Sequence, residues 1–266
     1  MEQVLFAFTL TLLAGLCTGI GSLMAFFTKK TNRKFLSVSL GFSAGVMIYV
    51  SMVELFADAK LTLITELGIR TGYLMTVVSF FCGMILIAVI DRLIPSEENP
   101  HELRNIEDMS EKIPDDTKLM RIGMMTALAV GIHNFPEGMA TFMSALQAPS
   151  VAIPIAIAIA IHNIPEGIAI SVPIFFATGD RKKAFTYSFL SGLTDPIGAL
   201  IFYLLLMPFM SHVLMGVIFA GIAGIMVFIS LDELLPSAEE YGEHHLSIYG
   251  MVAGMAVMAL SLLLFV

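Results

Sequence analysis

Two copies of one polar motif stand out in the sequence, HNFPEG at residues 133–138 and HNIPEG at residues 162–167. In each copy the His and the Glu are four residues apart, so on a helix both side chains project from the same face. Imidazole nitrogens and carboxylate oxygens are suitable ligands for Zn²⁺, Fe²⁺, Mn²⁺ or Co²⁺. A single copy could be an ordinary polar kink, but the repetition indicates a site for a divalent metal.

The amides of both motifs and a further carboxylate in the segment SGLTDP enlarge this candidate site. The candidate metal ligands are His133, Asn134, Glu137, His162, Asn163, Glu166 and Asp195. Seven side chains exceed the four ligands of one tetrahedral zinc ion, which favours two metals that share carboxylates. The chain has only two cysteines, so a thiolate cluster is excluded.

Each motif also contains a proline, which cannot donate a backbone hydrogen bond. Pro136 frees the carbonyl of Ile132, and Pro165 frees that of Ile161. We therefore expect a broken helical turn in each motif, of the kind that is tolerated where it faces a water-filled cavity.

The composition indicates that these motifs lie within a membrane. Of the 266 residues, 57% are hydrophobic and 14% are charged, and the mean hydropathy is +0.88. A soluble domain carries about 25% charged residues, whereas apolar runs of roughly 18 residues or more can cross a bilayer. The net charge of −8 offers no basic surface for nucleic acid. We predict an all-α membrane protein whose partner is the lipid bilayer, and we exclude soluble enzymes and nucleic-acid-binding proteins.

The apolar runs predict eight transmembrane helices in one domain that covers residues 1–266. Their expected ranges are about 3–28, 35–57, 71–94, 119–146, 151–177, 184–207, 212–235 and 247–266. Helices 1–3 thus occupy about 3–94, an acidic loop about 95–118, the two motif helices about 119–177, and helices 6–8 about 184–266. Membrane-spanning strands are excluded because the runs do not alternate and are too long.

The distribution of basic residues predicts the orientation of these helices. Twelve of the 14 Lys and Arg residues fall in the odd-numbered loops or at their edges, and only Lys60 and Arg70 fall on the other side. Basic loops stay on the cytoplasmic side. We therefore expect cytoplasmic odd-numbered loops, both termini outside, and a multi-pass location in the cell (inner) membrane.

The first and last thirds of the chain resemble each other. Residues 8–24 align with 185–201 at eight identical positions out of 17, and residues 41–59 align with 220–238 at seven out of 19. Helix 1 thus matches helix 6, and helix 2 matches helix 7, with each pair crossing in opposite directions. Together with the paired motifs this predicts a 3+2+3 inverted repeat, which is typical of secondary transporters with a midplane site.

Helices 3 and 8 give only a weak match. It consists of Tyr73 and Met75, which we place beside Tyr249 and Met251.

Four segments of the chain resemble the ZIP family of metal transporters, and the resemblance extends over essentially the whole sequence. They are HNFPEGMATF from His133, HNIPEGIAI from His162, SGLTDPIGA from Ser191 and GIMVFISLDELLP from Gly224. The resemblance implies uptake of a divalent metal into the cytoplasm, with zinc first and iron, manganese, cobalt and cadmium as further substrates. The metal would be cargo, and no cofactor is expected.

The resemblance also implies how the ligands divide between two metals. One metal would be held by His133, Glu137, His162 and Glu166, and the other by Asn134, Glu137, Asn163, Glu166 and Asp195. Position 195 is usually Glu in the family. The shorter Asp195 is expected to loosen the second site or to shift the metal preference.

Two other functions use the same residues. An intramembrane metal-dependent hydrolase could use the ligands to activate water, although the chain has no HExxH motif and no evident separate general base. A passive metal-gated channel would differ from a carrier in its flux rate and saturation. The sequence leaves a homodimer and the order of metal preference open.

Overall fold

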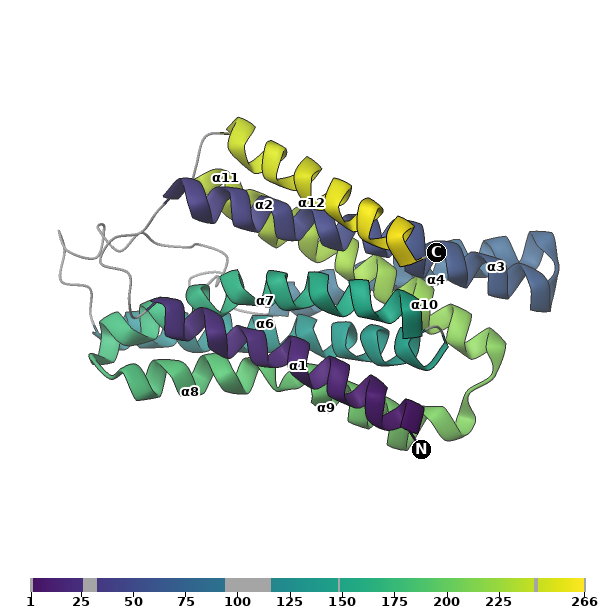
Figure 1. Cartoon of the computed structure of the whole chain (residues 1–266), viewed down its shortest axis with the longest axis horizontal. Coiled ribbons are helices and arrows are strands. Elements are labelled where there is room, and N and C mark those ends of the chain that lie inside the picture. The colour runs from purple at the N-terminus through teal and green to yellow at the C-terminus, as the bar shows by residue number, and fades with distance from the viewer. Residues whose placement is uncertain (1, 26–32, 94–115, 148, 242–243, 266) are drawn as a thin grey trace.

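The computed structural model describes residues 2–25, 33–93, 116–147, 149–241 and 244–265 (Figure 1). Among these residues every regular element is a helix and no strand occurs, which confirms the predicted all-α class. The predicted acidic loop 95–118 lies outside the described residues except for its last three, which open a helix.

The helical elements follow one another with few interruptions. In chain order they are α1 (Glu2–Ala25), α2 (Arg33–Tyr49), the π-helix η1 (Val50–Leu55), α3 (Phe56–Leu67), α4 (Ile69–Leu93), α6 (Asp116–Gln147), α7 (Pro149–Thr178), α8 (Arg181–Gly192), α9 (Thr194–Ile201), the π-helix η3 (Phe202–Leu206), the 3₁₀-helix η4 (Met207–Phe209), α10 (His212–Ile229), the π-helix η5 (Ser230–Leu234), α11 (Leu235–Tyr241) and α12 (His244–Phe265).

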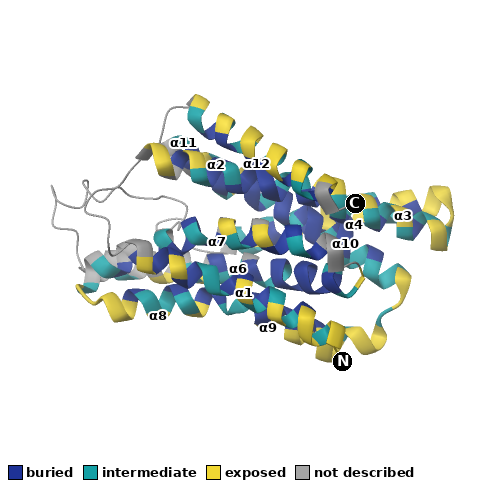
Figure 2. Ribbon diagram, in the orientation of Figure 1, coloured by how far each residue is buried: buried dark blue, intermediate teal, exposed yellow. Residues whose placement is uncertain are grey.

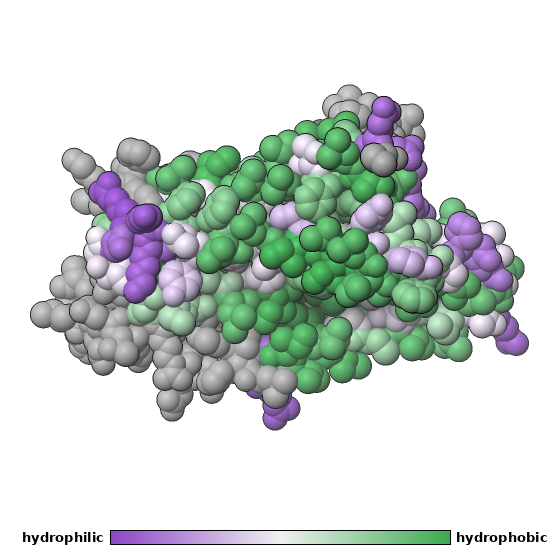
Figure 3. All heavy atoms as spheres, turned by 90° about the horizontal axis from the view of Figure 1, so that it is seen from below, coloured by the Kyte–Doolittle hydropathy of each residue, from purple (hydrophilic) through white to green (hydrophobic). Residues whose placement is uncertain are grey.

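Six stretches of the described residues are long and apolar enough to cross a membrane. They are Glu2–Leu23, Ser37–Leu67, Ile69–Arg92, Arg181–Phe209, His212–Leu234 and His245–Leu263. Helices α6 and α7 are not among them, although Ala152–Ile168 of α7 forms a shorter apolar helix. Apolar side chains cover the middle of the face in Figure 3, and hydrophilic residues gather towards its ends. The chain is therefore a multi-pass membrane protein.

Two segments are longer than the sequence predicts. The second segment continues through α3 to Leu67 instead of ending near residue 57. It ends at Gly68, whose positive φ of 80° is open to glycine but strained for other residues. The segment predicted to begin at residue 184 begins at Arg181, where the carboxylate of Asp180 accepts hydrogen bonds from the first free backbone N–H groups.

The helices form two groups (Figure 1). In one group α1 packs along α7, and α6 packs along α9. In the other group α2 packs along α12, and α10 packs along α4. The groups meet where α7 contacts α2 and α12, and where α6 contacts α10. Figure 2 shows buried residues on the faces between helices and exposed residues on the outer faces.

Two of the three π-helices in the described residues, η1 and η5, occupy aligned positions of the first and last thirds. The alignment of residues 41–59 with 220–238 places Ser51–Leu55 of η1 opposite Ser230–Leu234, which is the whole of η5. π-Helical residues make up well under about 1% of globular structure. The sequence similarity between the two segments is therefore accompanied by the same rare backbone conformation.

Two close helix contacts are also repeated. A Cβ atom built on Gly21 of α1 would overlap the carbonyl oxygen of Ile164 in α7, and one built on Gly198 of α9 would overlap that of Phe135 in α6. The alignment pairs Gly21 with Gly198, and the two motifs pair Ile164 with Phe135. Small residues allow such close backbone approach between membrane helices.

A second pair of contacts lies one turn away and involves the motif glycines. A Cβ atom on Gly138 would overlap the carbonyl oxygen of Asp195, and one on Gly167 would overlap that of Thr18. These contacts correspond to each other as well, because the alignment pairs Thr18 with Asp195. The motif helices are thus held against α1 and α9 by equivalent backbone contacts.

The same comparison corrects the weak match between helices 3 and 8. A Cβ atom on Gly45 would overlap the carbonyl oxygen of Met251, whereas one on the aligned Gly224 would overlap that of Phe80. The equivalent of Met251 is therefore Phe80 and not Met75. The Tyr-x-Met similarity placed the two helices in the wrong register.

These contacts predict which glycines the fold requires. Replacement of Gly138 or Gly167 by Ala should lower the stability of the protein in detergent by about 1–3 kcal/mol, because the added methyl group overpacks a helix contact. Gly221→Ala is the matched control, since its methyl group would lie 3.7 Å from the nearest atom, the carbonyl oxygen of Ser79. Thermal unfolding of the three variants checks this, and equal midpoints would contradict the close packing.

Candidate metal-binding site

Five of the seven candidate ligands have described side chains, and all five are buried. Their exposed fractions are 0% for Asn134, 1% for Glu137, 0% for Asn163, 3% for Glu166 and 1% for Asp195. The other two, His133 and His162, belong to α6 and α7, but their side chains lie outside the described part of the structure. Polar groups buried to this extent inside a membrane protein usually mark an ion or substrate pathway.

The three carboxylates come from three helices. Glu137 lies on α6, Glu166 on α7 and Asp195 in the first turn of α9. Both glutamates interact electrostatically with Asp195. Among the described side chains, however, no three His, Cys, Asp or Glu residues converge closely enough to form a metal site by themselves. Three carboxylates share one buried region, where a cation would offset the cost of their burial.

The amide of Asn163 connects α7 to both neighbouring helices. Its Nδ2 donates hydrogen bonds to the carbonyl oxygen of Ala14 in α1, at 3.1 Å, and to Oδ2 of Asp195, at 3.0 Å. These bonds use both amide hydrogens and so fix the orientation of the group. Among the described residues, Oδ1 of Asn163 and Oδ1 of Asp195 have no hydrogen-bond partner. One oxygen of each residue is thus available to a metal.

The equivalent amide in α6 is not held in this way. Neither Oδ1 nor Nδ2 of Asn134 has a hydrogen-bond partner among the described residues. The two motifs therefore match in sequence but differ in the contacts of their asparagines.

The sequence analysis did not predict that α1 contributes to the site. Besides the carbonyl oxygen of Ala14, α1 provides Gly15, and a Cβ atom there would lie only 3.0 Å from Oδ2 of Asp195. A backbone carbonyl leaves no motif in a sequence. The available signal was the internal alignment, which places Gly15 opposite Gly192 and Thr18 opposite Asp195.

The expectation of broken turns at the motif prolines is wrong. Helix α6 continues through Pro136 and α7 continues through Pro165. A proline has a helical φ and removes only one hydrogen bond, which packed membrane helices tolerate. The interruption lies instead at Leu193, between α8 and α9 and two residues before Asp195.

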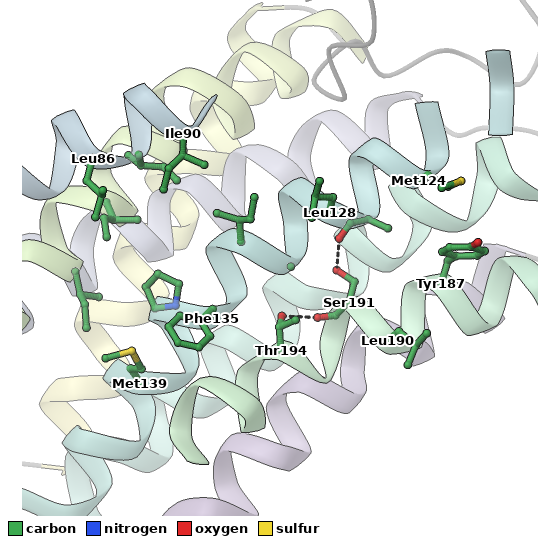
Figure 4. Close-up of a pocket in the computed structure, with 17 residues that line it drawn as sticks. Leu86, Ile90, Met124, Leu128, Phe135, Met139, Tyr187, Leu190, Ser191 and Thr194 are labelled. Carbon is green, nitrogen blue, oxygen red and sulfur yellow. Dashed lines mark hydrogen bonds between the residues drawn. The ribbon is translucent and has the colours of Figure 1, made fainter. Parts of the chain in front are cut away.

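A separate cavity lies between α4, α6, α8, α9 and α10 (Figure 4). Its volume is about 710 Å³, and its lining is mostly apolar. Two hydroxyl groups in the lining are already bonded, since Ser191 donates to the carbonyl of Ala127 at 3.0 Å and Thr194 to that of Ser191 at 2.6 Å. None of the candidate metal ligands lines this cavity, so it is distinct from the candidate site.

Carboxylate and amide groups buried between the helices of a membrane protein are typical of proteins that move ions across the bilayer. Residues 91–262 match the family model described as ZIP zinc transporter. The chain is 66% identical over 267 residues to "Zinc transporter ZupT" of Streptococcus mutans, covering 100% of both chains. It is 62% identical over 279 residues to "Zinc transporter ZupT" of Clostridium perfringens, covering 100% of this chain and 98% of the relative. It is 65% identical over 266 residues to "Zinc transporter ZupT" of Lysinibacillus sphaericus, covering 99% of both.

The chain belongs to the ZIP zinc transporter family. The comparisons therefore confirm the family resemblance seen in the sequence. Because this is a family of transporters, they also favour transport over the hydrolase hypothesis.

The different contacts of the two asparagines predict different effects on stability. In the presence of a metal chelator, Asn163→Ala should destabilise the protein more than Asn134→Ala by about 1–3 kcal/mol, since two hydrogen bonds are worth about 0.5–1.5 kcal/mol each. Both variants delete the same atoms from equally buried positions, so each serves as the control for the other. Thermal unfolding checks this, and an equal or larger loss for Asn134→Ala would contradict the hydrogen bonds of Asn163.

Proposed function

We propose that this protein is a secondary transporter that carries zinc across the cell membrane into the cytoplasm by alternating access. The observation that carries the proposal is the burial of three carboxylates in a membrane protein, where Glu137 and Glu166 each interact electrostatically with Asp195. Such burial is costly without a cation. Relatives with up to 66% identity are named zinc transporters, which makes zinc the first choice of cation.

We place the transported metal at a binuclear site near the midplane. One ion is held by His133, Glu137, His162 and Glu166, and the other by Asn134, Glu137, Asn163, Glu166 and Asp195. The buried oxygens of Asn163 and Asp195 support the second set, because the hydrogen bond between these residues leaves one oxygen of each unused among the described contacts. The chain supplies oxygen and nitrogen ligands that replace water around the passing ion.

We further propose eight membrane crossings in a 3+2+3 inverted repeat, with both termini outside. The repeated glycine contacts and the aligned turns η1 and η5 support the repeat. The start of α1 and the end of α12 lie at the same end of the molecule, as an even number of crossings requires (Figure 1). The excess of basic residues in the odd-numbered loops supports their cytoplasmic location.

The site residues predict which variants lose transport. Either Glu137→Ala or Glu166→Ala should abolish zinc uptake, because each removes a ligand shared by both ions. Glu66→Ala, at an exposed position of α3, should leave uptake unchanged. Uptake of ⁶⁵Zn by cells that contain equal amounts of each variant in the membrane checks this, and undiminished uptake in both site variants would refute the site.

The same ligands predict a range of substrates. Iron, manganese, cobalt and cadmium should compete with zinc, since carboxylate, amide and imidazole ligands accept all of these divalent ions. Competition during zinc flux into vesicles that contain the purified protein ranks the metals, with zinc expected to bind most tightly. A different metal with a clearly lower half-inhibitory concentration than unlabelled zinc would contradict the choice of zinc.

A further inference from the structure

Thr18 of α1 occupies the position that corresponds to Asp195. The alignment of residues 8–24 with 185–201 pairs these two residues directly. Their backbones make equivalent contacts, because the carbonyl oxygen of Thr18 lies against Gly167 and that of Asp195 lies against Gly138. The equivalence therefore rests on the three-dimensional contacts as well as on the sequence.

The side chains of the two residues also lie in equivalent places. Gly15 and Gly192 are paired by the alignment, and a Cβ atom on either would overlap the carbonyl oxygen of the other. The side chain of Asp195 lies against Gly15, and its Oδ2 is 3.0 Å from the position that a Cβ atom on Gly15 would take. The side chain of Thr18 lies against Gly192, and its Oγ1 is 2.8 Å from the position that a Cβ atom on Gly192 would take.

This correspondence identifies the neighbour of Thr18 across the site. Asp195 accepts a hydrogen bond from Asn163. The internal repeat that matches Asp195 with Thr18 also matches Asn163 of α7 with Asn134 of α6. Helix α1 packs against α6 as well as α7. Thr18 should therefore stand on the side of the site that contains Asn134.

Thr18 and Asn134 share an unusual property. Both have an exposed fraction of 0%, and among the described residues neither Oγ1 of Thr18 nor either amide atom of Asn134 has a hydrogen-bond partner. A buried hydroxyl group without a partner is unfavourable, because it has given up its hydrogen bonds to water and gained none in return. On the same helix, the hydroxyl of buried Thr11 donates to the carbonyl oxygen of Ala7 at 2.9 Å, so α1 can satisfy its hydroxyl groups locally.

We propose that the Thr18 hydroxyl is an additional oxygen ligand of the transported ion, on the Asn134 side of the site. This inference rests on the proposed transport function and adds a residue that neither motif contains. Because Thr18 is neutral where Asp195 carries a carboxylate, the two sides of the site bind metal unequally. A neutral oxygen ligand suits a hard ion such as Mn²⁺ better than Zn²⁺, so Thr18 also influences metal selectivity.

Thr18→Val tests the proposal, because it removes the hydroxyl and keeps the shape of the side chain. Loss of one neutral ligand should raise the KM for zinc uptake about threefold to tenfold with kcat unchanged. It should weaken zinc binding by the purified protein in calorimetric titration to a similar extent, and Mn²⁺ should lose more of its ability to compete than Cd²⁺. Thr18→Ser should recover most of the affinity.

The matched control is Thr11→Val, which removes a buried hydroxyl that has a partner in α1 and should alter neither zinc affinity nor metal competition. If Thr18→Val has the same zinc affinity and the same Mn²⁺ competition as the unmodified protein, the proposal is overturned. If Thr18→Val does not fold, Thr18→Ala and Thr18→Ser decide, since only the serine variant should keep the affinity. If Glu137→Ala and Glu166→Ala retain zinc uptake, the transport site itself is refuted. If both variants lose uptake while Thr18→Val is unaffected, only the role of Thr18 is refuted.

Discussion

The rest of the structure depends on the cost of holding three carboxylates inside a membrane protein. Glu137 and Glu166 each interact electrostatically with Asp195, and solvent barely reaches any of the three. Neither the apolar exterior nor bulk water can offset their charge there, so other groups of the chain and a cation must do so. The amide of Asn163 contributes directly, because it donates to Asp195 and is itself anchored on α1.

The hydrogen bonds of Asn163 require helices that lie very close together. Apolar side chains gain little from leaving lipid for a helix interface, so close backbone packing must hold membrane helices together. The glycines of the motifs and of α1 provide it by placing α-carbons against carbonyl oxygens. A larger side chain at Gly138 would move α6 away from Asp195 and would alter packing and site geometry together.

Backbone contacts repeat between the two halves of the chain more faithfully than side-chain chemistry does. Thr18 and Asp195 share a backbone environment, yet only Asp195 bonds to its neighbouring asparagine. Duplication can preserve how helices pack while each side of the site acquires its own ligands. With the proposed Thr18 ligand, the site would have a carboxylate on the Asp195 side and a hydroxyl group in the equivalent position on the other side.

The sequence by itself determined the helical class, the family and the residues of the two motifs, because hydropathy and helical spacing are local properties. Five of the candidate ligands are indeed buried. Only the tertiary structure revealed the part played by α1, the continuation of α2 through α3 to Leu67, the intact helices at the motif prolines and which residues of α4 and α12 correspond to each other. The part played by α1 and the residue match between α4 and α12 depend on contacts between segments far apart in the chain, and the hydropathy and spacing of one segment do not report such contacts.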